Sequence, residues 1–315
     1  MTQYILRRLI HSIFIIWGCA TLVFFMLRAV PGDPVVVMLG PEYTPEAAEA
    51  LRKKLGLDEP IYVQYAKWAG NVLTGDLGTS IASPGPVVET LKIGLPKTLS
   101  LAALSFTLGL LIALPAGIMS ALRRNSMVDY AASLVAFIGV SMPGFWLGII
   151  LILVFAVRLQ WLPAVGYAPI DEDGFRAWFE HLIMPSLAIG VSYAAILMRF
   201  VRTGLLEVLN SDYIRTARAK GVSERRVIFR HALRNAMIPV VTVAGIQLAL
   251  LLSGAVVVET VFSIRGLGRI LVGAIFDKDY PVVQGVILVT TVIFVLANLV
   301  VDLLYTFLDP RITYE

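Results

Sequence analysis

Long apolar stretches, separated by polar segments, run through the sequence from end to end. A hydrocarbon core about 30 Å thick requires roughly 20 apolar residues of helix. Six stretches meet this requirement and predict six membrane-spanning helices, at about Leu9–Leu27, Leu101–Leu122, Ala131–Val157, His181–Met198, Met237–Val258 and Val282–Leu304. The first stretch is too long for the apolar region of a signal peptide, so we expect it to be retained as a helix. The pattern therefore predicts an all-α membrane protein.

Helix-breaking residues interrupt these spans, at Pro115, Pro143-Gly144, Pro185, Gly190 and Gly254. Non-helical backbone at membrane depth is stable only beside protein or water, so broken helices often line the path of a transported substrate. Proline and glycine are also simply more frequent in membrane helices than in soluble ones. Both explanations stay open, and we include Ser141 and Pro143 among the candidate pathway or gate residues.

Polar and charged side chains inside the predicted spans are few. Gln247 and Asn298 lie within spans five and six, where they can line the path or bond between helices. Glu259 ends the fifth span, and we favour capping or pairing at an outer gate over contact with a substrate. Arg199 and Arg202 end the fourth span, from which their side chains can snorkel to the aqueous face.

A polar segment too long for a plain connector, residues 31–97, follows the first span. Thr44 is a favourable N-cap and Gly56 a favourable C-terminal stop, which predicts a helix over Pro45–Leu55. A second amphipathic helix is predicted from apolar residues that share one face, at Ile61, Tyr65, Trp68 and Val72. We expect these helices to lie on the membrane or to pack as a small periplasmic cap.

These patterns divide the chain into three parts. Residues 1–97 form the first span with the long periplasmic segment, residues 98–306 form a five-helix core, and residues 307–315 form a tail. The core contains one long polar loop at residues 205–236.

Composition supports a membrane location and excludes several classes of protein. Hydrophobic residues make up 58% of the 315 positions and charged residues 15%, with a mean hydropathy of +0.81. Charged residues make up about a quarter of an average soluble domain. A soluble globular enzyme and a disordered chain are therefore excluded, and the single cysteine, Cys19, excludes a disulfide scaffold.

The net charge of +4 reflects orientation. Nine of the 26 Lys and Arg residues fall between Arg199 and Arg234. Cytoplasmic loops carry such an excess of Lys and Arg, so we expect this segment to be cytoplasmic. It lies between the fourth and fifth of six predicted spans, which places both termini on the same, cytoplasmic side. Binding to nucleic acid is therefore not needed to explain the basic character.

The basic loop itself is interpreted as two short helices. The first begins at Ser211 or Asp212 and ends at Gly221. Small residues that allow close approach of another surface alternate here with basic residues: Ala217, Ala219 and Gly221 among Arg215, Arg218 and Lys220. Such a helix tip is typical of a docking element. An ordinary basic loop held near anionic lipid is the alternative.

The second helix of the loop is predicted to begin at Ser223, with Glu224 in its first turn, where the helix dipole favours an acid. Phe229, Leu233 and Met237 would form its apolar stripe and lead into the fifth span.

The order of residues in this loop resembles the coupling loop of bacterial ABC importer permeases, of the type I class with an EAA-type loop. It is most similar to the dipeptide, oligopeptide and nickel branch of that family. The residues that carry the resemblance, and that it identifies as contacts for an ATPase, are Asp212, Tyr213, Arg215, Thr216, Ala217, Arg218, Ala219, Lys220, Gly221, His231, Arg234 and Asn235.

Short motifs along the rest of the chain are similar to the same branch. They are Pro31-Gly-Asp-Pro34, Gly75-Asp-Leu-Gly-Thr-Ser80, Ser141-Met-Pro143, Glu259-Thr-Val-Phe262, Asp279-Tyr-Pro-Val-Val-Gln284 and Asp309-Pro-Arg311. One departure is Arg265, where the branch commonly has proline. The resemblance thus covers nearly the whole chain.

This resemblance implies the type I importer permease fold and a set of partners. A second homologous permease would complete the translocation pathway, two cytoplasmic ABC ATPase subunits would dock on the coupling loops, and a periplasmic or extracellular solute-binding protein would deliver substrate. The expected location is the bacterial cytoplasmic (inner) membrane. Implied substrates are di- and oligopeptides or glutathione-like solutes, with nickel chelates or opines as the alternative.

The residues offer little chemistry of their own. The chain has no Gly-x-x-x-x-Gly-Lys-Ser/Thr phosphate loop, so we expect ATP and Mg²⁺ to be bound by partner subunits, with no cofactor and no catalytic residue here. His11, His181 and His231 lie on different segments, so no metal site is expected. A self-contained channel or secondary transporter is the alternative function. It would need an ion relay within the spans, where carboxylates are nearly absent.

Overall fold

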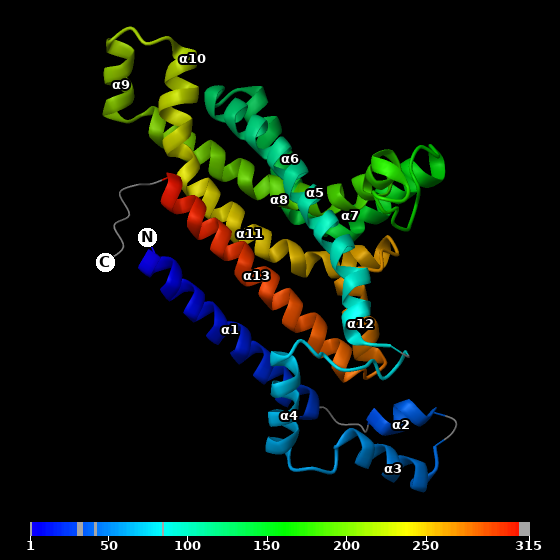
Figure 1. Cartoon of the computed structure of the whole chain (residues 1–315). Helices are drawn as coiled ribbons and strands as arrows, with labels where there is room; N and C mark the ends of the chain where they lie inside the picture. The colour runs from blue at the N-terminus through cyan, green and yellow to red at the C-terminus, as the bar shows by residue number, and fades with distance from the viewer. Residues whose placement is uncertain (1, 30–33, 41–42, 84, 309–315) are drawn as a thin grey trace. The chain divides into compact units, whose positions relative to one another are not determined.

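The computed structural model describes residues 2–29, 34–40, 43–83 and 85–308 (Figure 1). Within these ranges the chain is helical, apart from loops and one isolated bridge between Thr79 and Pro86. The elements are α1 Thr2–Ala29, α2 Pro34–Leu39, α3 Pro45–Leu55, α4 Ile61–Leu73, α5 Val87–Leu122, α6 Met127–Ser141, α7 Gly144–Leu151, η2 Ile152–Arg158, α8 Gly174–Leu209, α9 Asp212–Ala219, α10 Glu224–Arg226, η3 Val227–Ala232, α11 Leu233–Val261, α12 Leu267–Phe276 and α13 Tyr280–Leu308.

The described helices confirm an all-α membrane protein. Five of them are long and apolar enough to cross a membrane, and α6 with α7 and η2 adds a sixth when this bent pair is taken as one span. The motif Asp309-Pro-Arg311 lies outside the described residues, and so does Pro31-Gly-Asp-Pro34 except for its last residue. Most of the predicted tail at residues 307–315 also lies outside them.

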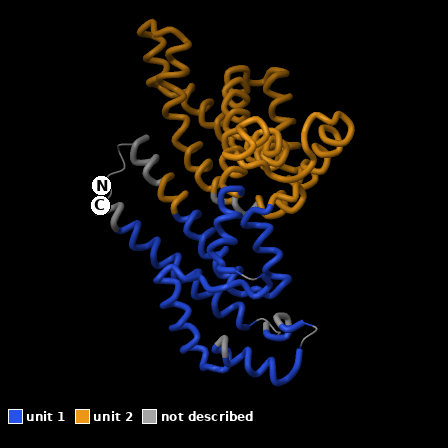
Figure 2. Tube along the Cα trace, turned by 45° about the vertical axis from the view of Figure 1, so that its right-hand side comes forward, with its two compact units in different colours: residues 1–97, 265–295 blue, residues 98–264, 296–315 orange. Residues whose placement is uncertain are grey.

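The chain folds into two compact units (Figure 2). One consists of residues 1–97 and 265–295, and the other of residues 98–264 and 296–315. Helices α5 and α13 each contribute residues to both units.

In the first unit, α4 packs on α1 through aromatic rings. The ring centroid of Phe24 on α1 lies 5.3 Å from that of Tyr65 and 5.0 Å from that of Trp68, both on α4. The hydroxyl groups of Thr21 and Tyr65 are hydrogen-bonded at 2.8 Å. Arg28 Nε donates to Gln64 Oε1 at 3.0 Å. Tyr65 and Trp68 of the predicted amphipathic face of α4 therefore pack against the first span, whereas Ile61 at the start of that face is 46% exposed.

The boundaries of α3 are those predicted from its capping residues. Thr44 has extended backbone, and its hydroxyl accepts from the N–H of Ala47 at 3.2 Å. Gly56 ends the helix in the left-handed region, with φ +67°, where a glycine has no steric penalty.

The rest of the first unit is built around a second apolar cluster, formed by the start of α5 with α12 and α13. Its fully or nearly buried members are Val87, Leu91, Leu267, Ala274, Val282, Val283 and Val286. Beside it the side chain of Asp279 accepts hydrogen bonds from the hydroxyl of Ser80 and from the N–H of Ala82. Two motifs that are far apart in the sequence, at residues 75–80 and 279–284, are thereby joined.

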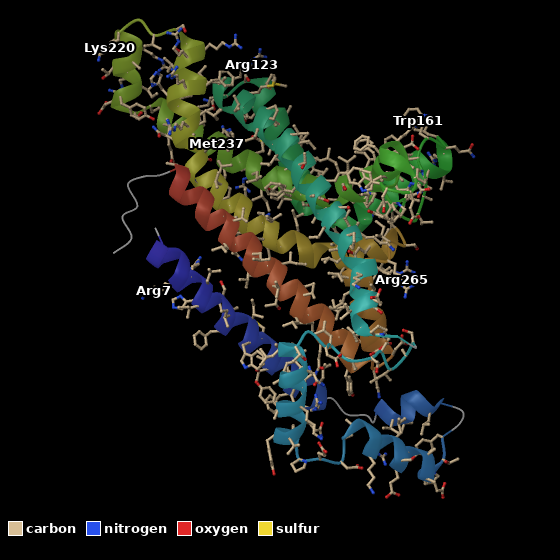
Figure 3. The ribbon with its side chains drawn as sticks, in the orientation of Figure 1. Arg7, Arg123, Trp161, Lys220, Met237 and Arg265 are labelled. Carbon is tan, nitrogen blue, oxygen red and sulfur yellow. The ribbon has the colours of Figure 1, made fainter. Side chains whose placement is uncertain are left out.

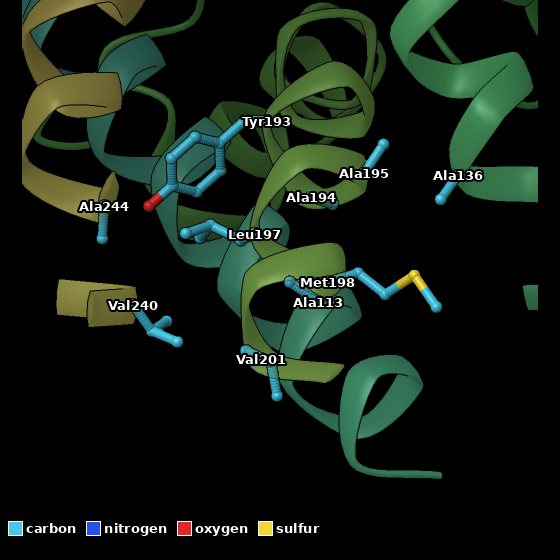
Figure 4. Close-up of a cluster of buried hydrophobic side chains, with 10 residues drawn as sticks. All are labelled: Ala113, Ala136, Tyr193, Ala194, Ala195, Leu197, Met198, Val201, Val240 and Ala244. Carbon is cyan, nitrogen blue, oxygen red and sulfur yellow. The ribbon is translucent and has the colours of Figure 1, made fainter. Parts of the chain in front are cut away.

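Helix α8 is the central element of the second unit and contacts α6, α7 and α11. Figure 4 shows part of its packing, with the ring of Tyr193 reaching from α8 towards Ala244 on α11. Small residues allow close approach on another side. A Cβ added at Gly190 would lie 2.9 Å from the carbonyl oxygen of Ser105 on α5.

The predicted span at 131–157 is broken by a sharp bend. Helix α6 is inclined by 103° to the segment Gly144–Arg158, which consists of α7 and η2. Pro143 causes the break, because it has no N–H and restricts the residue before it to extended backbone. Met142 has φ −89° and ψ 123°. The interruption predicted at Pro143-Gly144 within this span is therefore confirmed.

The other predicted interruptions are wrong. Helix α5 continues through Pro115, α8 continues through Pro185 and Gly190, and α11 continues through Gly254. Within a membrane helix, neighbouring helices compensate for the hydrogen bond that a proline removes. A proline therefore does not by itself end a span.

Candidate functional site

The polar loop between α8 and α11 folds as a packed structure. Helix α9 lies beside η3 in Figure 1, and the two are in contact. Ile214 on α9 is 0% exposed. It packs in a cluster with Ala121, Leu205, Val227, Ala232 and Ala236. The loop is therefore packed against the ends of α5 and α8.

The predicted start and end of α9 agree with the structure in position. Ser211 occupies the N-cap, but its hydroxyl donates to the carbonyl oxygen of Val208 at 2.6 Å and does not cap the helix. Asp212 lies in the first turn, where the helix dipole favours an acid. Gly221 follows the helix with φ +75°, in the left-handed region. Ser223 likewise precedes α10 without a side-chain cap.

Two of the three basic residues predicted around the tip form ion pairs inside the loop. Arg215 Nη1 lies 3.2 Å from Asp212 Oδ1. Arg218 donates to both oxygens of Glu224, from Nε at 3.1 Å and from Nη2 at 2.6 Å. These hydrogen bonds to the Glu224 carboxylate raise the pKa of Arg218 above its ordinary value. Lys220 is exposed and has no ion pair with any described residue.

The small residues of the loop face different ways. Ala217 is half-buried and packs on the cluster around Ile214. Ala219 is exposed, and a Cβ added at Gly221 would meet nothing within 4 Å. The open tip therefore consists of Ala219, Lys220 and Gly221. Figure 3 labels Lys220 at the turn that follows α9.

Further predicted residues connect α9 with the start of α11. Asn235 Nδ2 donates to the hydroxyl oxygen of Tyr213 at 2.8 Å, across the outer face of the loop. Thr216 Oγ1 donates to the carbonyl oxygen of Asp212 within α9. Arg234 is exposed and His231 is half-buried. Apart from Ala217, most predicted docking residues thus lie on an accessible surface.

The apolar stripe predicted for the second helix is wrong at Phe229, which is 55% exposed. The inward-facing residues are Val227, Ile228 and Ala232. The cause is the π-helical turn of η3, in which hydrogen bonds run to the fifth residue and not to the fourth. The extra residue in the turn moves Phe229 off the face expected for an α-helix.

The candidate pathway residues differ in their exposure. Ser141 and Pro143 are exposed beside the break, with Ser141 Oγ donating to the carbonyl oxygen of Phe137. Gln247 and Asn298 are half-buried. Glu259 is 0% exposed, and Thr98 Oγ1 donates to its Oε1 at 2.6 Å. Its buried, hydrogen-bonded carboxylate fits the structural role that the sequence favours.

A buried charge network was missed by sequence reasoning. Asp129, at the start of α6, is 2% exposed and accepts from Arg202 Nε at 2.7 Å and from Nη2 at 2.8 Å. Arg202, which the sequence places at the end of the fourth span, thus has a partner within the protein. Ser126 and Asp129 have the spacing that marks a helix start, and the Ser126 hydroxyl accepts from the Asp129 N–H at 3.4 Å. That local signal could not identify a partner on another helix.

Comparison with known protein families identifies the chain. The profile described as "Binding-protein-dependent transport system inner membrane component" matches residues 113–314. The N-terminal profile of the same transport systems matches residues 1–102. The chain belongs to this family. Family membership makes it an integral membrane component of a binding-protein-dependent transport system.

Relatives of this permease family match over their full length. The chain is 43% identical over 317 residues to the oligopeptide transport system permease protein AppB of Bacillus subtilis. It is 43% identical over 314 residues to the probable peptide ABC transporter permease protein y4tP of Sinorhizobium fredii. It is 43% identical over 315 residues to the glutathione transport system permease protein GsiC of Escherichia coli O6:H1. Each match covers 100% of both chains.

The fold of the present chain is also found in a solved structure. One chain from a crystal structure of the MetNI methionine ABC transporter in an inward-facing conformation superposes on the present chain with a TM-score of 0.59. The two sequences are 20% identical. The match covers 72% of the present chain and 100% of the other. The fold is therefore that of an ABC importer permease.

Proposed function

We propose that this chain is the permease subunit of an ATP-binding-cassette importer that takes up peptides or glutathione-like solutes. It would form half of the translocation pathway and pair with a second, homologous permease. Two cytoplasmic ABC ATPases would bind and hydrolyse ATP with Mg²⁺, and an external solute-binding protein would deliver the substrate.

The observation that carries the proposal is the packed loop at residues 205–236 in a chain of this family. Ile214 fixes α9 to the helix ends, while the tip from Ala219 to Gly221 stays open to a partner. A rigid projection with a small tip is suited to transmit force from an ATPase. Peptide and glutathione substrates are supported by the names of the full-length relatives.

Orientation follows from charge. Nine basic residues between Arg199 and Arg234 favour a cytoplasmic location for the loop. With six spans, both termini then lie in the cytoplasm, and α3 and α4 lie outside.

The test is purification and uptake. The chain, coexpressed with the ABC ATPases, second permease and solute-binding protein encoded beside it, should copurify with the ATPases. In proteoliposomes the complex should transport radiolabelled peptide only when Mg-ATP is supplied on the side of the membrane to which the loop at residues 205–236 is exposed. Transport should run towards that side. Uptake by this chain alone, driven by an ion gradient, would instead establish a secondary transporter.

The substrate is tested separately. Binding of dipeptides, oligopeptides, glutathione, nickel chelates and opines to the purified solute-binding protein should be compared by calorimetry. Tight binding of a nickel chelate or an opine, with no binding of peptides, would replace the proposed substrate and leave the importer function intact.

A further inference from the structure

The carboxylate of Asp129 is enclosed by hydrogen-bond donors from several elements. Arg202 on α8 donates to both of its oxygens. The hydroxyl of Ser120 on α5 and the N–H of Asn125, between α5 and α6, also donate to it. A carboxylate that is 2% exposed needs such donors, because a buried charge without partners is strongly unfavourable.

These donors bring the ends of three helices to one point. Ser120 lies near the end of α5, Asp129 in the first turn of α6, and Arg202 two turns before the end of α8. The two-pronged guanidinium–carboxylate contact fixes orientation as well as distance. The Asp129 carboxylate is therefore a joint that holds α6 against α5 and α8.

The same helix ends carry the coupling helix. Ala121, the neighbour of Ser120, and Leu205, one turn beyond Arg202, belong to the cluster in which Ile214 of α9 is buried. A displacement of α9 therefore acts on the helix ends to which Asp129 is bonded. From Asp129, α6 runs to Ser141, directly before the 103° break at Met142 and Pro143.

We propose that Asp129 is a positioning residue that, through Arg202, passes movement of the coupling loop to α6 and to the break before Pro143. The proposal rests on the proposed function, because it assigns a role in coupling ATP hydrolysis to transport. Coupling between two sites is a free energy that has to be measured as such.

The test uses the complete transporter with its ATPases and solute-binding protein in proteoliposomes. Asp129→Asn keeps the size of the side chain and removes its charge. The number of solute molecules imported per ATP hydrolysed should fall about fivefold or more, while the yield of assembled complex stays at the wild-type level. A residue needed only for stability would lower import and hydrolysis together and leave this ratio unchanged.

A matched control lies on the same central helix. Arg176 and Glu180 form an exposed ion pair near the start of α8, with a distance of 2.7 Å between Arg176 Nε and Glu180 Oε1. Glu180→Gln removes one charge from this pair and should leave the ratio of import to hydrolysis unchanged.

A second readout does not depend on transport. Spin labels at Met127, on α6, and at Glu207, on α8, flank the joint, and both side chains are exposed. In a Cys19→Ser background, the distance distribution between the labels should be narrow in the assembled wild-type complex and broad in the Asp129→Asn variant.

The outcomes separate the two proposals. An unchanged ratio or an unchanged distance distribution in Asp129→Asn would overturn the role of the joint. If that variant does not assemble, the same two measurements are made on Arg202→Lys. Lysine keeps the positive charge but cannot donate to both carboxylate oxygens in the two-pronged geometry of the guanidinium. Failure of both variants to assemble would assign the pair to folding alone. Absence of ATP-driven import in the wild type would refute the proposed function and with it the coupling role that rests on it, whereas an unchanged ratio in a transporter that does import would refute the role of Asp129 alone.

Discussion

At Gly221 the backbone adopts φ +75°, immediately beyond the end of α9. A side chain in this region costs about 1–2 kcal/mol, and a β-branched residue is least tolerated. The space around Gly221 is open, so the backbone conformation and not crowding makes glycine the favoured residue at this position. The shape of the tip formed by Ala219, Lys220 and Gly221 therefore depends on one residue.

We predict that Gly221→Val abolishes ATP-dependent uptake while the complex still inserts and assembles, because valine displaces the tip from the left-handed conformation. Uptake into vesicles, normalised to complex yield, measures the effect. Gly70→Val is the matched control, since Gly70 lies in α4 with open space around it and no positive φ. Wild-type uptake by Gly221→Val would disprove the assignment of this tip to docking.

Individual site residues were predictable where the signal is local. Gly221 and Asp212 have positions that follow from helix-end chemistry within a few residues. The pairing of Asp129 with Arg202 joins residues 73 positions apart and leaves no periodic signal in the sequence. The inward direction of Ala217 was equally hidden, because it depends on how α9 rests on α8.

At the scale of elements, helix boundaries near strong caps were predicted accurately, whereas among the predicted helix breaks only the one at Pro143-Gly144 is present. Thr44 and Gly56 define α3 because each satisfies backbone groups of that helix directly. Pro115 and Pro185 look like Pro143 in the sequence, yet the first two lie in continuous helices. Whether a proline ends a helix depends on neighbouring helices, which the local sequence does not describe.

Close packing of α8 on α5 gives an element-scale prediction. The Cβ of alanine at position 190 would lie 2.9 Å from the carbonyl oxygen of Ser105, which is backbone and cannot rotate away. Gly190→Ala should therefore destabilise the protein by about 1–3 kcal/mol. The midpoint of thermal unfolding of the purified complex reports the change.

The control for this substitution is Gly18→Ala in α1, where an added Cβ meets nothing within 4 Å. Alanine has the higher helix propensity, by about 1 kcal/mol, so this variant should unfold at the same temperature as the wild type or higher. A Gly190→Ala protein as stable as Gly18→Ala would contradict the close contact between α5 and α8.

At the scale of the whole molecule, the class of fold was predictable because lipid imposes strict requirements on length and polarity. Apolar stretches gave the approximate positions of the spans. The division into two compact units was not predictable from these stretches, because residues 265–295 join residues 1–97 through contacts between distant parts of the chain.

The distribution of basic residues predicts which surface faces the cytoplasm. In a Cys19→Ser background, a cysteine at Lys220 should be protected from a membrane-impermeant maleimide in intact spheroplasts, and a cysteine at Glu49 on α3 should react. Disruption of the membrane should expose Lys220→Cys. Labelling of Lys220→Cys in intact spheroplasts would reverse the orientation, because the positive-inside rule would then fail for this chain.

The π-helical turn of η3 has a consequence for insertions and deletions. Such a turn holds one residue more than an α-helical turn, so η3 is equivalent to a single-residue insertion accommodated within a continuous helix. Deleting one residue between positions 227 and 232 would restore regular α-helix and would rotate the preceding segment, with α9, relative to α11. We therefore expect the deletion of one residue from η3 to be tolerated only when the face of α9 that packs on η3 also changes to fit the rotated surface.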